Sequence, residues 1–202
     1  QELSQYLRPK HPKMIAMLEA INQNPADDAL YPPLQLWMAS VADRHGSNIV
    51  AESWFIQDAK GNQVARSPQD PVSYRKAYWY RDYFHGLGKE PDKKDPVAQA
   101  AIKPITSPHL SCVYPSTTTG LLKVAFTVPI WKTVADESEP ELKGSGTPKL
   151  DEKGQPLREV IGVLAMSVNL KDFTVLDKKL AGGSQVMLID LRDDWIDPTK
   201  DR

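Results

Sequence analysis

The stretch of sequence that decides the fold is Ser53-Trp-Phe-Ile-Gln-Asp-Ala-Lys-Gly-Asn-Gln-Val-Ala65. A mostly apolar run from Ser53 to Ile56 gives way to the turn-forming residues 58–62, and apolar character returns at Val64 and Ala65. Two short apolar runs around a glycine-containing turn are typical of a β-hairpin. We therefore predict a pair of antiparallel strands here, with the rest of a sheet built around it.

The residues before the hairpin are predicted to be helical. Apolar residues recur at helical spacing in two sets, which are Met14, Ile15, Leu18 and Ile21, and then Leu34, Trp37, Met38 and Val41. Such spacing places each set on one face of a helix. Pro25 and the pair Pro32-Pro33 are expected to separate the two helices, because proline disrupts a helix interior.

The residues after the hairpin predict the remainder of the sheet. Residues 71–103 are expected to be helical or irregular, and three strands are expected at 110–115, 121–131 and 160–168. The charged, Gly- and Pro-rich residues 132–159 predict an exposed insertion, and a helix over 170–180 and a strand over 185–191 follow. This order predicts an α+β fold, with a central antiparallel sheet of five to six strands and the long N-terminal helices packed on one side.

Composition excludes several classes of function. The 202 residues carry 25 Lys plus Arg and 26 Asp plus Glu, for a net charge of −1, so no nucleic-acid partner is expected. The single cysteine, Cys112, lies among apolar residues and is expected to be a buried, inert thiol. No run of about 20 apolar residues is present to span a bilayer.

The sequence also lacks recognisable catalytic patterns. Its four histidines are scattered without metal-ligand spacing, and no nucleophile motif or phosphate-binding glycine loop is found. We therefore expect this chain to have no catalytic residues, no metal site and no cofactor, and not to be an enzyme.

One dense group of chemically distinctive residues is Tyr78-Trp-Tyr-Arg-Asp-Tyr-Phe-His85, in which Arg81 sits among five aromatic rings. One interpretation is an ordinary core in which Arg81 forms a salt bridge with Asp82. The other is a small-molecule pocket, with apolar walls and an arginine that binds a carboxylate or phosphate. The residues alone leave both interpretations open.

The order of motifs resembles the Cache family of sensor domains. Trp54 to Asn62 resembles the opening strand pair of that family, Arg81-Asp-Tyr-Phe84 its R-x-Y-F element, and Ile105-Thr-Ser-Pro-His109 its "I-S-P" entry. The strand ending at Val128-Pro129-Ile130 and the final strand from Ile161 to Leu170 are similar to later family elements. Arg75 precedes Trp79-Tyr80 by four residues rather than two, so the amino-acid specificity of one Cache subset is not carried over.

The resemblance implies a single PAS-like Cache module at residues 47–192, preceded by a helical segment 1–46, carrying the insertion 132–159 and followed by a tail 193–202. It implies an extracytoplasmic, periplasmic or extracellular, ligand-sensing input domain of a membrane-anchored signal-transduction protein with a kinase, chemoreceptor or cyclase output. The partner would be a small polar or anionic molecule, such as an organic acid or amino acid. The residues expected to contact it are Trp79, Arg81, Tyr83, Phe84, His85, Tyr114 and Ser116.

Two other hypotheses stay open from the sequence. A domain of the same fold can bind no small ligand and serve to pair two copies through the N-terminal helices. An enzyme with an unrecognised site is the third hypothesis.

Overall fold

The computed structural model describes residues 12–45, 51–133 and 150–170. In chain order its helices are α2 (Pro12–Gln23), the 3-10 helix η1 (Asp28–Leu30), α3 (Tyr31–His45), α4 (Asp82–His85) and α5 (Pro96–Ala101). Its strands are β1 (Ser53–Asp58), β2 (Gln63–Ser67), β3 (His109–Leu110), β4 (Tyr114–Pro115), β5 (Leu122–Thr133) and β6 (Arg158–Asn169).

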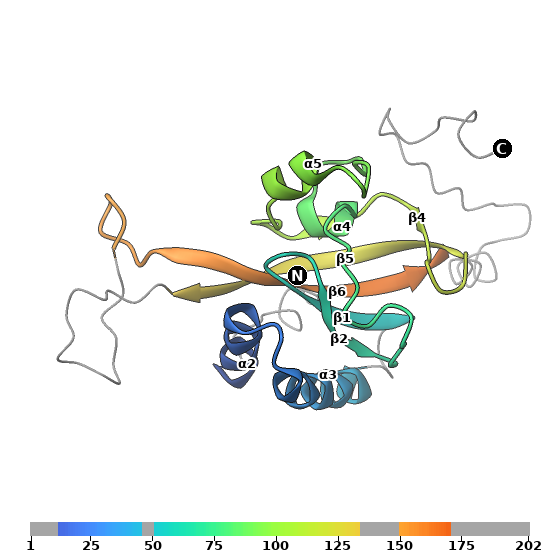
Figure 1. The fold of residues 1–202 in the computed structure, drawn as a ribbon, viewed down its shortest axis with the longest axis horizontal. Coiled ribbons are helices and arrows are strands. Elements are labelled where there is room, and N and C mark those ends of the chain that lie inside the picture. The colour runs from blue at the N-terminus through green and yellow to red at the C-terminus, as the bar shows by residue number, and fades with distance from the viewer. Residues whose placement is uncertain (1–11, 46–50, 134–149, 171–202) are drawn as a thin grey trace, which may run out of the picture.

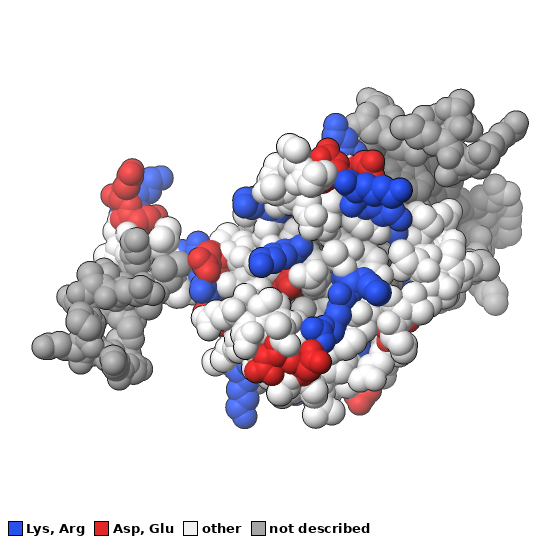
Figure 2. All heavy atoms as spheres, in the orientation of Figure 1, with Lys and Arg blue, Asp and Glu red and all other residues white. Residues whose placement is uncertain are grey.

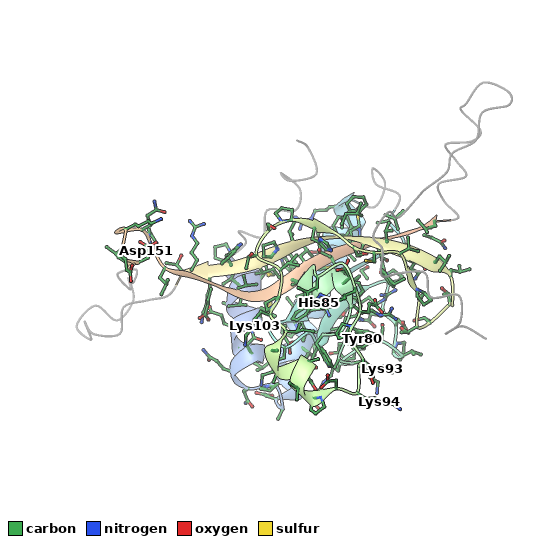
Figure 3. All side chains as sticks on the ribbon, turned by 90° about the horizontal axis from the view of Figure 1, so that it is seen from above. Tyr80, His85, Lys93, Lys94, Lys103 and Asp151 are labelled. Atoms are coloured by element: carbon green, nitrogen blue, oxygen red, sulfur yellow. The ribbon has the colours of Figure 1, made fainter. Side chains whose placement is uncertain are left out.

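The six strands form one antiparallel sheet in the order β2-β1-β6-β5-β3, and β4 also pairs with β5. The long partners β5 and β6 run from Lys123 opposite Asn169 to Thr133 opposite Arg158. Before β6 the chain forms an exposed turn around Asp151, which Figure 3 labels away from the body of the sheet. With helices on its faces, this sheet confirms the predicted α+β fold with a central antiparallel sheet.

Two helices cover one face of the sheet (Figure 1). Met14, Leu18 and Ile21 of α2 are fully buried, as are Leu34 and Met38 of α3. They join one core with sheet residues that include Trp54, Ile56, Val64, Val128, Ile130, Leu164 and Met166. Burial of this apolar surface is the main force that holds the helices on the sheet.

The other face is covered by α4, α5 and their connecting loops (Figure 1). Its core is mostly aromatic and comprises Phe55, Tyr78, Trp79, Tyr83, Phe84, Ile105, Tyr114, Ala125, Val163 and Ala165. The sheet contributes mainly small residues here, and the rings of the crossover segment fill the space above them. The two faces of the sheet therefore have cores of different chemistry.

The structure confirms most of the predicted elements and corrects some boundaries. Pro32 and Pro33 do not separate the helices but lie in the first turn of α3, where a missing N–H breaks no helical hydrogen bond. The strand predicted at 110–115 is interrupted, because the backbone N–H of Cys112 donates to the Asp82 carboxylate instead of to β5. Cys112 is buried, as predicted.

The ends of the predicted insertion 132–159 belong to β5 and β6, because Lys132 pairs with Glu159 and Thr133 with Arg158. Residues 150–157 are exposed, and residues 134–149 of the predicted insertion lie outside the described residues. The helix expected over 170–180, the strand over 185–191 and the tail 193–202 fall outside the described residues, apart from Leu170. The division into a helical segment 1–46 and a sensor module 47–192 stays a prediction.

In the described part of the chain, no helix has the length and apolar character needed to cross a membrane.

Gly162 sets the closeness of α2 to the sheet, and this gives a first prediction. A Cβ at this position would lie 2.3 Å from the Gln57 carbonyl oxygen and 2.8 Å from a Leu18 methyl. Gly162→Ala is therefore expected to lower the free energy of unfolding by about 2 kcal/mol or more, because the backbone of β1 must move. Urea denaturation measures the change.

Gly154→Ala is the comparison variant. Gly154 has φ +71°, but a Cβ added there would meet no atom within 4 Å, so only backbone strain of about 1 kcal/mol is expected. Equal stability losses in the two variants would contradict the steric role given to Gly162.

Candidate functional site

The aromatic segment is held against the turn of the β1–β2 hairpin. The Tyr78 N–H donates to the Gly61 carbonyl at 2.8 Å, and a Cβ on Gly61 would lie 2.6 Å from the Trp79 Cα. Gly61 has φ +81°, a conformation that glycine adopts without strain. The close crossing lets residues 78–85 turn inward, and residues 81–85 are all buried.

Arg81 is buried in this segment and its guanidinium is already paired. Its Nη1 lies 3.1 Å from both carboxylate oxygens of Glu90, and its Nη2 donates to the Pro115 carbonyl at 3.2 Å. The rings of Tyr80 and Tyr114 each have their centroid 5.2 Å from the guanidinium carbon. The interpretation in which Arg81 forms a salt bridge with Asp82 is therefore wrong, because the partner of Arg81 is Glu90.

Asp82 instead joins three chain segments. Its carboxylate accepts hydrogen bonds from His109 Nε2 at 2.9 Å, from the Cys112 N–H at 2.6 Å and from the Gly88 N–H at 2.7 Å. Burial alone would raise the pKa of Asp82, but these donors, with His109 first among them, hold that pKa well below its usual range. Asp82 is therefore a charged structural residue that ties α4 to β3 and β4.

His85 has both ring nitrogens occupied. The Leu87 N–H donates to Nδ1 at 3.1 Å, so Nε2 carries the proton and donates to the Tyr80 carbonyl at 3.1 Å. Burial lowers the pKa of His85. In Figure 3 His85 and Tyr80 lie on the side of the sheet that α4 covers.

A cavity opens between this segment and the sheet, and four of the seven predicted ligand contacts line it. We call it the hydroxyl cavity, because hydroxyl groups dominate its lining. Arg81, Tyr83, Tyr114 and Ser116 contribute to its wall, together with Phe55, Gln63, Arg66, Ser73, Tyr78, Thr117, Thr118, Lys123 and Ser167. Its volume of about 30 Å³ has room for roughly two water molecules.

Trp79, Phe84 and His85 do not line the hydroxyl cavity. All three are buried, and Trp79 and Phe84 belong to the aromatic core. Their role as ligand contacts stays a prediction, and the site considered below is built without them.

Tyrosine hydroxyls in the hydroxyl cavity act as neutral hydrogen-bonding groups. Burial raises the pKa of Tyr83 and of Tyr114, so both phenols stay protonated at physiological pH. The Tyr78 hydroxyl lies 3.2 Å from Thr117 Oγ1 at the rim. The lining therefore offers several donors and acceptors around a wall of aromatic rings.

Arg66 is the residue of this site that the sequence analysis missed. Its Nε is buried and has no hydrogen-bond partner among the residues that the structure describes. Arg66 pairs with Phe55 across the hairpin, so both lie on the aromatic side of the sheet. No signal in the sequence indicates this pairing, because it depends on a register shift between Ile56 and Gln57.

The charged and metal-ligating groups elsewhere give no second centre. Within the described ranges, no group of three or more His, Cys, Asp or Glu side chains is arranged to hold a metal ion. Figure 2 shows acidic and basic side chains interspersed over the face in view, without a continuous patch of one sign.

Comparisons with known proteins give similarity in structure only. No family model and no curated protein matches the chain. Among solved structures, the V. cholerae histidine kinase DctB sensor domain matches at 16% identity and TM-score 0.46, covering 81% of this chain and 45% of that one.

Two further solved structures are similar to the chain. The ligand-binding domain of the Pseudomonas aeruginosa PAO1 amino acid chemoreceptor PctC, in complex with GABA, matches at 15% identity and TM-score 0.40, over 88% of this chain and 63% of that one. The E. coli DcuS sensor domain matches at 11% identity and TM-score 0.36, over 82% and 92%. The chain spans less than half of the DctB domain. At these scores the similarity carries no argument about ligand or function.

The pairing of Arg81 leads to a prediction about stability. Arg81→Met is expected to lower the free energy of unfolding by about 2–3 kcal/mol, because the partly buried Glu90 carboxylate loses its partner. The double variant Arg81→Met with Glu90→Gln is expected to recover part of that loss. Urea denaturation of the wild type, the two single variants and the double variant forms a double-mutant cycle, which measures the coupling between Arg81 and Glu90. A destabilisation by Arg81→Met that Glu90→Gln leaves unchanged would contradict the pairing.

The two hydrogen bonds of His85 lead to a prediction about pH. Because burial lowers the folded-state pKa below the usual 6.5, the unfolded chain takes up a proton more readily. The stability contributed by neutral His85 is thus complete above about pH 6.5 and is lost as pH falls toward the folded-state pKa. Of its charged neighbours, Asp82 raises the pKa of His85 and His109 lowers it.

Urea denaturation between about pH 7.5 and pH 5 tests this dependence. His85→Gln keeps a donor and an acceptor but does not titrate, so the loss of stability toward pH 5 is expected to be smaller than in the wild type. Parallel pH profiles for the two proteins would show that His85 contributes nothing to the dependence.

Proposed function

We propose that this chain is a ligand-sensing domain of the Cache type, carried by a membrane-anchored signal-transduction protein on the extracytoplasmic side. It would bind a small polar or anionic molecule in the hydroxyl cavity and pass a conformational change to an output module. The observation that carries the proposal is the lining of that cavity, in which Arg66 lies with hydroxyl-bearing and aromatic side chains. The Nε of Arg66 is buried and has no hydrogen-bond partner among the described residues. Such a set of donors suits a carboxylate or phosphate oxygen.

The anchor of the ligand is assigned to Arg66 rather than to Arg81. Arg81 is neutralised by Glu90, and its release would cost the energy of a buried ion pair. No described carboxylate lies within salt-bridge distance of Arg66. A ligand anion at Arg66 therefore gains a charge-assisted hydrogen bond without displacing a protein partner.

The small volume of the hydroxyl cavity implies that binding opens it. Two side-chain contacts join loops at its rim, namely Thr118 Oγ1 to Asp70 Oδ2 at 2.6 Å and Tyr78 Oη to Thr117 Oγ1 at 3.2 Å. Parting these loops would make room for a ligand, and closing them around it would shift the population of the two states. A sensor needs such a pair of states.

Arg66 also connects the cavity to the helical layer. The Gln35 side chain of α3 accepts from the Arg66 N–H at 2.9 Å, and its Nε2 donates to the Arg66 carbonyl. Movement of the Arg66 backbone would thus displace the Gln35 side chain and, with it, α3. This is the route by which ligand binding would shift the N-terminal helices relative to the sheet.

A thermal-shift screen against organic acids, amino acids, amines, purines and phosphates tests the proposal, because a ligand that binds only the folded state raises the melting temperature. For an anionic hit, Arg66→Gln is expected to weaken binding by about 10-fold or more, as measured by isothermal titration calorimetry. Arg158→Gln removes the same charge at an exposed position away from the cavity and is expected to bind as the wild type does.

If no compound raises the melting temperature of the folded protein, and if its molecular mass in solution rises with concentration, the pairing of two copies through the N-terminal helices would be favoured. An anionic hit that binds Arg66→Gln as tightly as wild type would place the ligand elsewhere.

A further inference from the structure

A second, larger cavity lies on the other side of Arg66, between α3 and the segment that follows β2. We call it the α3 groove. It is lined by Pro32, Gln35 and Leu36 of α3, by Arg66, and by Gln69, Asp70, Pro71 and Tyr74. Its volume of about 390 Å³ falls in the range of small-molecule sites, whereas the hydroxyl cavity is more than ten times smaller.

The walls of the α3 groove are mainly apolar. Leu36 is 72% exposed although it lies in a concave site, and Pro32 and Pro71 are exposed beside it. Tyr74 adds an aromatic surface, and its ring packs edge-on against Tyr31 at 6.2 Å. A ligand with an apolar body would remove this surface from water, at about 25 cal/mol for each Å² covered.

The polar groups of the α3 groove define the charge of that ligand. Both ends of the Gln35 amide are engaged by the Arg66 backbone, so Gln35 holds the strand and is not free for a ligand. The Asp70 carboxylate accepts from the Val72 N–H at 3.0 Å and from Thr118 Oγ1 at 2.6 Å. Arg66 and Asp70 are the two charged residues of the lining. The Arg66 Nε is a buried donor without a hydrogen-bond partner among the described residues. The Arg66 Nε therefore needs a hydrogen-bond acceptor, and a negatively charged acceptor suits it best.

We propose that the α3 groove binds a small organic carboxylate with an apolar body, its carboxylate on Arg66 and its body against Leu36, Pro71 and Tyr74. The site goes beyond the proposed function, because it stands whether or not the hydroxyl cavity takes a ligand. A ligand here would sit between α3 and residues 69–74, and so would act on the helical layer as a wedge.

Three probes with the same phenyl group test the chemistry of recognition. They are 3-phenylpropanoate, its neutral amide and 2-phenylethylamine, titrated into the whole chain by calorimetry. The carboxylate is expected to bind, the amide at least about 10-fold more weakly, and the amine not measurably, since a charge-assisted hydrogen bond is lost or reversed. Binding of the amine as tight as that of the carboxylate, or binding of none of the three up to millimolar concentration, overturns the proposal.

Variants place the probe in the α3 groove. Leu36→Glu puts a negative charge on its wall at an exposed helical position, and is expected to weaken 3-phenylpropanoate binding at least about 10-fold without unfolding the chain. Val97→Glu makes the same change at a 75% exposed position of α5 and is the matched control. Equal affinity of Leu36→Glu and Val97→Glu overturns the proposal.

A third variant separates this site from the hydroxyl cavity. Tyr78→Phe removes a hydroxyl from the hydroxyl cavity and lies outside the lining of the α3 groove. It is expected to leave 3-phenylpropanoate affinity unchanged. A loss with Tyr78→Phe that Leu36→Glu does not cause would assign the probe to the hydroxyl cavity, overturning the α3 groove while supporting the proposed function.

Discussion

The pairing of β1 with both β2 and β6 is the constraint on which the rest of the molecule depends. Because β1 lies inside the sheet, successive side chains face opposite layers, so Trp54 and Ile56 contact the helical core and Phe55 the aromatic one. On β6 the same alternation sends Leu164 and Met166 to the helices. A slip of one residue would exchange the two sets and place small residues under α2 and α3. The register thus fixes both layers at once.

The small residues on the aromatic side explain why the crossover segment can be so rich in rings. Ala125, Val163 and Ala165 leave depth above the sheet, and Tyr83 fills it, with Phe55 at 5.3 Å and Tyr114 at 5.1 Å between ring centroids. Arg81 and Asp82 are buried together with those rings, so their charges need partners. Arg81 is paired with Glu90, and the Asp82 carboxylate accepts hydrogen bonds from three donors in other segments. What looked like a binding motif is thus largely a set of charges satisfied by distant partners.

Features fixed by interactions between residues close in sequence could be predicted, whereas features fixed by contacts between distant residues could not. Helices, the hairpin and the two long strands were predicted, since periodicity and turn residues are local signals. The break between β3 and β4 was not, because it depends on a hydrogen bond from Cys112 to a carboxylate 30 residues earlier. Glu90 was not foreseen as the partner of Arg81 for a related reason. The contact joins residues nine apart, whereas the neighbouring Asp82 carboxylate accepts from His109. Arg66 went unnoticed because its sequence context is that of an ordinary strand, and its importance appears only when its Nε is seen to lack a partner.

The position of Arg66 gives the two cavities a physical connection. Arg66 belongs to the lining of both, and its backbone N–H and carbonyl are both hydrogen-bonded to the Gln35 side chain of α3. If both cavities take an anion on the Arg66 side chain, as proposed, the two anions compete for one set of donors, and occupancy of one cavity is expected to lower the affinity of the other. The hinge of such a coupling would be the segment 68–75. Its Asp70 bonds to Thr118 at the rim of the hydroxyl cavity, its Ser73 lines that cavity, and its Gln69, Pro71 and Tyr74 line the α3 groove. By linkage the effect is reciprocal, and α3, which contacts Arg66 through Gln35, is the element that would carry it outward.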